Sequence, residues 1–310
     1  MFSFRKRSEP APVPKPTVEI DGYEEIFYRS NDDLQLYARV YPAAGAEKGR
    51  PALCLPGLTR NSRDFHDLAM FLSQHPEHPR DVYAVDYRGR GLSDRDSDWE
   101  NYSLLVEAND VLDLMAIAGL HKAAIVGTSR GGLIAMTLAC IRPAAIGVVV
   151  LNDIGPVIET RGLARIASYV GKMPLPESWD DAAEMMREVN QKAFSAIGDA
   201  QWMEVARAAF NEKDGKPAPG YDPALEKDFE ALDLSQPVPP LWNQFTALTP
   251  FPALVLRGQN SDLLSEETVA EMASRHPNLN HVTIPGEGHA PLLKDQESVE
   301  AVSQFLIAND

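Results

Sequence analysis

The sequence predicts an α/β fold in which a mostly parallel sheet is flanked by helices. Short apolar runs that suit buried strands alternate with segments whose apolar residues recur at helical spacing. In addition, the strand-like run 123–126 leads directly into Gly127-Thr128-Ser129-Arg130-Gly131 and then into an apolar helix. A buried strand, a tight turn and a helix in this order are typical of a parallel sheet.

The chain begins with a predicted antiparallel hairpin of strands 24–29 and 34–40, joined by turn-forming residues. Six further strands are predicted: 52–55, 82–85, 123–126, 147–151, 253–256 and 281–284. Helical spacing predicts helices from about residue 62 and at 103–120, 130–141 and 297–307.

The alternation of strands and helices stops between residues 154 and 248. This stretch carries helical patterns at 160–170, 180–194, 200–211 and near Trp242, with a loop at 214–223. We therefore expect an α/β core at 17–153 and 249–310 with an inserted helical cap at 154–248. Residues 1–16 are basic and then rich in proline, which predicts a flexible arm.

Composition excludes several classes of partner. The formal net charge of −16 argues against nucleic acid and anionic membranes, which attract concentrated basic charge. The arm has no apolar segment of the kind found in signal peptides, and no run is long enough to span a bilayer. Cys54 and Cys140 lie in apolar stretches and are predicted to be reduced and buried, so we expect a cytoplasmic protein. Homo-oligomer formation is left open.

Ser129 is the candidate nucleophile. Glycines at 127 and 131 remove the Cβ atoms that would block a sharp turn between strand and helix. About one chain of this length in ten contains the five-residue pattern by chance, so its meaning depends on the rest of the site.

A serine hydroxyl needs a base within hydrogen-bond reach. His289 lies directly after the strand predicted to end at Ile284, at the carboxyl edge of the sheet where Ser129 is also expected. The other histidines lie in loops, on helices or before strands: His66, His75, His78, His121, His276 and His281. His289 is therefore the predicted general base, against the alternative of a structural loop histidine.

The base in turn needs a carboxylate that fixes its tautomer. Asp262 and Asp153 each follow a predicted strand at the same edge. We favour Asp262, because the acid commonly follows the penultimate strand, and keep Asp153 as the alternative acid. Either aspartate could instead cap loop N–H groups.

Two backbone N–H groups are expected to form an oxyanion hole. One belongs to Arg130, the residue after the nucleophile. The other belongs to Leu58, in the turn after strand 52–55. The alternative for Pro56-Gly57 is an ordinary turn.

These motifs resemble those of the α/β-hydrolase family, in the branch with an inserted helical cap. The resemblance covers nearly all of the chain after the arm and rests on residues 55–58, 86–93, 127–131, 261–262 and 288–289. Pro56-Gly57 stands where family members often carry His-Gly. Residues 86–93 are similar to a family motif that shapes a loop near the site, which implies a structural role.

The resemblance implies a serine hydrolase. Ser129 argues against the branches with an aspartate nucleophile, and Ala290-Pro291 replaces the aromatic residue usual in carbon–carbon bond hydrolases. Hydrolysis of a small-molecule carboxylic ester or lactone through an acyl-enzyme on Ser129 is thus expected. No metal or organic cofactor is expected, because no His, Cys and carboxylate cluster has ligand spacing.

Two other functions remain open: acyl transfer on the same triad, and a receptor-like protein that binds a ligand and turns it over slowly. The predicted cap would cover the site. We interpret its large apolar residues mainly as the cap's own core and secondarily as a substrate lining. They are Met185, Met186, Phe194, Trp202, Phe210, Trp242 and Phe245.

Overall fold

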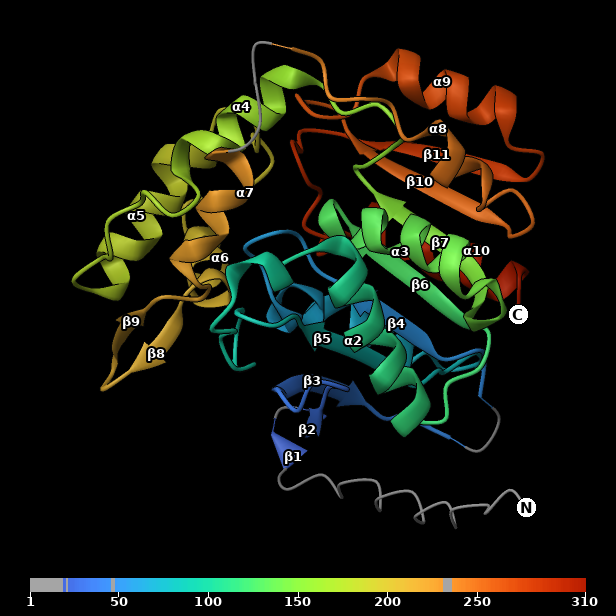
Figure 1. Ribbon diagram of the computed structural model, residues 1–310, viewed down its shortest axis with the longest axis horizontal. Helices are drawn as coiled ribbons and strands as arrows, with labels where there is room; N and C mark the ends of the chain where they lie inside the picture. The colour runs from blue at the N-terminus through green and yellow to red at the C-terminus, as the bar shows by residue number, and fades with distance from the viewer. Residues whose placement is uncertain (1–18, 21, 46–47, 231–235) are drawn as a thin grey trace, which may run out of the picture.

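A nine-stranded sheet forms the centre of the computed structural model, which describes residues 19–20, 22–45, 48–230 and 236–310 (Figure 1). The predicted arm at 1–16 lies outside these residues. The strands lie in the order β1-β2-β3-β5-β4-β6-β7-β10-β11. Their bounds are β1 (Glu19–Ile20), β2 (Tyr23–Arg29), β3 (Gln35–Tyr41), β4 (Ala52–Leu55), β5 (Val82–Asp86), β6 (Ala123–Thr128), β7 (Ile146–Asn152), β10 (Ala253–Gly258) and β11 (Leu279–Ile284).

The sheet is mostly parallel, as predicted. Strands β1, β2 and β3 and the β3–β5 pair are antiparallel, so the predicted hairpin forms one margin of the sheet. From β5 to β11 every pair is parallel. The inner strands β4, β6, β7 and β10 are short apolar runs because helices cover both faces of the sheet, whereas the edge strand β11 is partly exposed.

Helices pack on the two faces of the sheet in separate apolar clusters. One cluster joins the sheet to α2 (Leu104–Ile117), α3 (Arg130–Ile141) and α9 (Glu266–Arg275). The other joins it to α1 (His66–Ser73) and α10 (Gln296–Ala308) on the opposite face. This is the predicted layering of an α/β fold.

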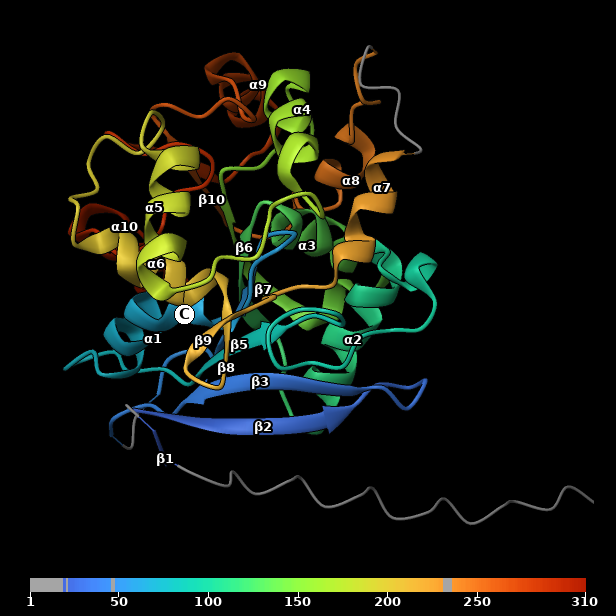
Figure 2. The ribbon, with the colours of Figure 1, turned by 90° about the vertical axis from the view of Figure 1, so that its left-hand side faces the viewer.

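Between β7 and β10 the chain forms a further set of elements, which we call the insert; most of it lies to one side of the sheet, but its last helix packs against α3 (Figures 1 and 2). It comprises α4 (Thr160–Tyr169), α5 (Trp179–Asn190), α6 (Gln201–Ala209), β8 (Asn211–Lys213), β9 (Lys216–Ala218), α7 (Lys227–Glu230) and α8 (Trp242–Thr246). The predicted helices at 160–170, 180–194 and 200–211 correspond to α4, α5 and α6.

The small hairpin of β8 and β9 differs from the prediction, which assigned 214–223 to a loop. Asp214 and Gly215 at its tip both have positive φ, which suits a tight turn. The strands are three residues long and lie in polar sequence. Alternation over so few residues gives no periodic signal.

Cys54 and Cys140 are both free thiols. Cys54 is buried in β4 as predicted, but Cys140 is exposed on α3, so that part of the prediction was wrong. In the last turn of α3, Leu138 and Ala139 are buried against the core, whereas Cys140 and Ile141 lie on the exposed side of the helix. Within the described ranges, no helix combines the length and apolarity that a bilayer span requires.

Candidate active site

Ser129 lies on the turn between β6 and α3. Its backbone φ of 50° is positive, a conformation that costs energy for a residue with a side chain, and its N–H donates to the carbonyl of Asn152 at 3.0 Å. The helix passes so close to β4 that a Cβ on Gly131 would lie 2.0 Å from the carbonyl oxygen of Leu55. Glycine at 131 is therefore required for this close approach of α3 to β4, a reason that differs from the turn geometry predicted from the sequence.

His289 reaches Ser129 from the loop after β11. Its Nε2 lies 2.9 Å from the Oγ of Ser129, within hydrogen-bond distance. The two residues are 160 positions apart in the chain, and the sheet brings them together because both follow parallel strands at the same edge. The predicted neighbourhood of Ser129 and His289 is therefore present in the structure.

Asp153 is the carboxylate that contacts His289. Its Oδ2 lies 2.8 Å from the Nδ1 of His289 and accepts a hydrogen bond from the hydroxyl of Ser261 at 2.5 Å. Its Oδ1 accepts from the N–H of Gly258 at 2.8 Å. Asp153 is fully buried and has φ of 55° at the end of β7, which lies directly between β6 and β10. These hydrogen bonds hold the carboxylate next to Nδ1 of the imidazole ring.

Asp262 does not occupy the predicted position. It accepts two hydrogen bonds from Arg165 of α4, from Nε at 2.6 Å and from Nη2 at 2.8 Å. Burial opposes ionisation of Asp262, but the hydrogen bonds and charge of Arg165 outweigh burial and lower the pKa of this carboxyl. The preference for Asp262 over Asp153 as the partner of His289 is therefore corrected: the turn after β10 directs Ser261 toward Asp153 and Asp262 toward the insert.

The two predicted oxyanion donors belong to residues close to Ser129. Arg130 begins α3, where backbone N–H groups carry the positive end of the helix dipole. Leu58 lines the same cavity as Ser129, and a Cβ on the neighbouring Gly57 would lie 3.9 Å from the Cβ of Ser129. The carbonyl of Leu58 accepts from the Nε of buried Arg90 at 2.9 Å, which holds the turn. The oxyanion hole itself stays a prediction.

Residues 86–93 form a tight loop beside this turn. Both carboxylate oxygens of Asp86 accept backbone hydrogen bonds, from Ser62 at 2.7 Å and from Leu92 at 2.8 Å. A Cβ on Gly91, which has positive φ, would lie 1.9 Å from Oδ2 of Asp86. The loop is therefore built around a buried carboxylate, consistent with the structural role that we expected.

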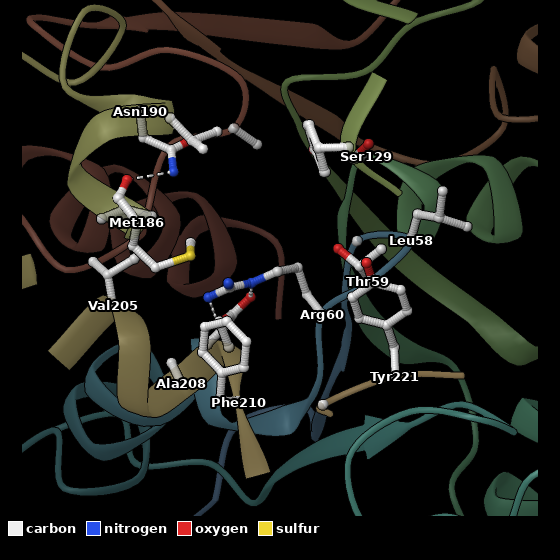
Figure 3. Close-up of a pocket in the computed structure, with 18 of the residues that line it drawn as sticks. Leu58, Thr59, Arg60, Ser129, Met186, Asn190, Val205, Ala208, Phe210 and Tyr221 are labelled. Carbon is white, nitrogen blue, oxygen red and sulfur yellow. Dashed lines mark hydrogen bonds and ion pairs between the residues drawn. The ribbon is translucent and has the colours of Figure 1, made fainter. Parts of the chain in front are cut away.

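A cavity of about 380 Å³ opens in front of Ser129 and His289 and runs beneath the insert (Figure 3). Its walls come from the turn after β4 and from α4, α5 and α6. Four of the seven large apolar residues noted in the sequence line it: Met186, Phe194, Trp202 and Phe210. The interpretation of these four mainly as an internal core was therefore incomplete, because Phe194 and Trp202 both pack in the insert and face the cavity. Trp242 and Phe245 pack edge to face against each other and do not line the cavity.

Several polar side chains of the cavity wall were not among the predicted site residues, including Arg60, two positions after Leu58, and Tyr169 at the end of α4. Arg60 lies in the turn that carries a predicted oxyanion donor, so its charge was a signal in the sequence. The direction of its side chain, however, depends on packing. No group of three or more His, Cys, Asp or Glu side chains within the described part of the chain could hold a metal ion.

Glu287, two residues before His289, gives a prediction for the pH dependence of stability. It is 5% exposed, and burial raises its pKa from 4.5 to about 7, although the N–H of Leu292, 2.7 Å from Oε2, favours the charged form. Between these values the folded protein keeps a proton that the unfolded chain loses. The contribution to stability is therefore present at low pH and lost as the pH rises toward 7, by up to about 3 kcal/mol.

We expect Glu287→Gln to lack this decrease, so that urea unfolding at pH 5 and pH 8 differs less in the variant than in the wild type. Glu188→Gln, an exposed position on α5, is the matched control and should follow the wild type. Equal pH dependence in Glu287→Gln and the wild type would contradict the prediction.

The serine hydroxyl, the imidazole and the carboxylate form a continuous series of hydrogen-bond contacts that ends in the cavity. In such a series the ring can accept the serine proton while the carboxylate stabilises the resulting imidazolium. The profile of the Alpha/beta hydrolase family matches residues 52–302 of the chain. The chain belongs to the alpha/beta hydrolase family.

Known relatives of this hydrolase cover almost the whole chain. The 3-hydroxybutyrate-oligomer hydrolase of Cupriavidus necator is 32% identical in an alignment of length 287 that covers 86% of this chain and 94% of that protein. Esterase YbfF of Escherichia coli is 25% identical, over 83% of this chain and 92% of its own. A crystal structure of an alpha/beta hydrolase from Novosphingobium aromaticivorans superposes with a TM-score of 0.84 at 39% identity, covering 93% of this chain and 99% of that one.

Proposed function

We propose that this hydrolase is a serine esterase in which Ser129 is the nucleophile, His289 the general base and Asp153 the orienting acid. The observation that carries the proposal is the pair of contacts at the two ring nitrogens of His289. Nε2 lies 2.9 Å from Ser129 and Nδ1 lies 2.8 Å from Asp153. The tautomer that donates from Nδ1 to the carboxylate leaves Nε2 free to accept the serine proton.

The reaction would proceed in two halves. Ser129 Oγ attacks the ester carbonyl carbon while its proton moves to His289, and the tetrahedral oxyanion faces the N–H groups of Leu58 and Arg130. The intermediate collapses as His289 returns the proton to the departing alcohol. Water then attacks the acyl-enzyme with the same assistance, which releases the acid and restores Ser129.

The substrate that we propose is a short linear oligoester of a hydroxy acid. The walls of the cavity are mainly apolar, and its volume of about 380 Å³ is that of a site for a small molecule. The relative from Cupriavidus necator is named as a hydrolase of 3-hydroxybutyrate oligomers, and its similarity extends over 86% of this chain. Hydrolysis of one such ester bond consumes one water and yields one new carboxylic acid and one alcohol.

A fluorophosphonate probe tests the nucleophile directly. We expect stoichiometric labelling of Ser129 in the folded protein, located by peptide mass spectrometry, with parallel loss of hydrolysis of a 3-hydroxybutyrate dimer. Heat-unfolded protein should not be labelled, because the serine is reactive only beside His289. Absence of labelling in folded protein would overturn the proposal.

A further inference from the structure

An ion pair lies in the wall of the otherwise apolar cavity. Arg60 donates from Nε to Oδ2 of Asp64 at 2.7 Å and from Nη2 to Oδ1 at 2.5 Å, and both residues line the cavity. Their side chains are only 22% and 23% exposed. A pair withdrawn from water in this way stabilises a fold little compared with well-packed apolar side chains, so stability alone does not explain it.

One edge of the Arg60 guanidinium remains available to a ligand. Asp64 accepts the hydrogen bonds of Nε and Nη2. Nη1 donates to none of the described residues, and it is not buried. Figure 3 shows the side chain extending into the pocket toward Met186 and Phe210, away from Ser129. Asp64 thus fixes a guanidinium whose free edge faces the substrate cavity.

Tyr169 adds a second donor from the insert. It lies at the end of α4 and lines the cavity. Burial raises the pKa of Tyr169, and the positive charges of Arg165 and Arg60 and a hydrogen bond with Arg165 only partly offset that increase. Its hydroxyl therefore stays protonated and can donate a hydrogen bond to a ligand in the cavity whose wall it shares with Arg60.

We propose that Arg60, together with Tyr169, binds a carboxylate of the substrate, so that the enzyme selects esters that carry a free acid group. This inference rests on the proposed function and specifies its substrate class. A planar guanidinium held in one orientation recognises a carboxylate by directed, charge-assisted hydrogen bonds. A linear hydroxy acid oligomer ends in such a group, and the fixed place of Arg60 relative to Ser129 then determines which ester bond is cleaved.

The neighbouring charges limit the size of the effect. Asp64 neutralises Arg60, and Lys294, the other cation in the wall, lies 3.2 Å from Asp67 and 3.6 Å from Glu204. The carboxylate is therefore recognised through directed donors and not through a positive field. We expect a preference of about tenfold to a hundredfold in kcat/KM, the range of a hydrogen bond to a charged group.

The competing explanation is that Arg60 only shapes the turn that carries Leu58. Its N–H donates to the carbonyl of Gly57 at 3.1 Å, and a Cβ on Gly57 would lie 3.5 Å from its Cγ. In that case the loss of the side chain would lower turnover of charged and neutral esters alike. Matched substrates separate the two explanations.

The experiment compares the linear 3-hydroxybutyrate dimer with its terminal primary amide, which has the same shape and a single ester bond but no charge. For the wild type we expect kcat/KM to be at least about tenfold higher for the acid than for the amide. In Arg60→Gln the preference should fall below about threefold, chiefly through KM of the acid. Tyr169→Phe should lower the preference in the same direction with the fold intact. Arg29→Gln, an exposed cation on β2, is the control for general charge effects and should keep the preference.

Three results would overturn the proposal. They are a wild-type enzyme that does not distinguish acid from amide, an Arg60→Gln variant that loses both activities equally, and an Arg29→Gln variant that loses the preference as Arg60→Gln does. The first needs no variant, so misfolding of Arg60→Gln leaves the test decisive. Failure of the proposed function would give a different result. Neither the acid dimer nor its amide would then be hydrolysed, or the hydrolysis of both would persist in Ser129→Ala.

Discussion

Replacing Ser129 with alanine is expected to lower kcat/KM for p-nitrophenyl esters at least about a thousandfold while the protein remains folded. The hydroxyl is the only group removed, and it contacts the Nε2 of His289 at the cavity. The residual rate would come from binding and from the oxyanion donors. Steady-state kinetics with thermal unfolding of the same samples checks both parts of the prediction.

Ser274→Ala provides the matched control, because this serine is exposed on α9 and donates to the carbonyl of Glu271 in its own helix. It should show wild-type kinetics. If Ser129→Ala retained activity within about tenfold of the wild type, another nucleophile would carry the reaction and the proposed mechanism would fail.

The second prediction with a large effect distinguishes the roles of Asp153 and Asp262. Asp153→Asn should lower kcat by about a thousandfold or more, because the amide no longer stabilises the imidazolium and can favour the wrong tautomer of His289. Asp262→Asn should lower kcat by less than about tenfold, because that carboxylate contacts Arg165 and not the ring. Both substitutions keep the shape of the side chain, so kcat values for one ester compare them directly.

The reverse order of effects would restore the assignment made from the sequence. A loss in Asp262→Asn as large as that in Asp153→Asn would mean that the two carboxylates exchange partners during turnover. Chemical shifts of the His289 ring in the two variants provide a second readout, since only the loss of its own partner should alter the Nδ1 proton strongly.

The sheet and the contact between Ser129 and His289 could be predicted because they depend on local signals. Buried parallel strands are short apolar runs, and the residues that follow them lie at one known edge of the sheet. Ser129 follows such a run, and His289 follows the partly exposed edge strand β11 at the same edge. Their contact is therefore a consequence of topology, although no property of either residue alone implies it.

The acid could not be predicted in the same way. Asp153 and Asp262 follow adjacent strands at one edge, so strand positions do not distinguish them. The choice depends on the direction of each side chain in its turn, and on Arg165, which lies 97 residues from Asp262 in the chain. The direction of the Arg60 side chain in its turn could not be predicted for the same reason. For the apolar residues of the insert, helical spacing shows which residues share a face but not what that face covers.

The contacts of α4 with the core limit where substrates can enter the cavity. The N–H of Glu159 donates to the carbonyl of Leu263 at 3.0 Å, Arg165 binds Asp262, and Gly162 packs against the Asp262 carbonyl. Lifting this helix would break all three links at once.

The wall of the cavity nevertheless reaches the protein surface elsewhere. Leu175, in the loop between α4 and α5, is 52% exposed, and Val189 on α5 is 40% exposed, and both line the cavity. We expect substrates to enter at this point, because entry there would leave the contacts of α4 with the core intact. Both side chains are apolar, so an incoming ester would first contact hydrocarbon and reach the proposed carboxylate site at Arg60 only further inside.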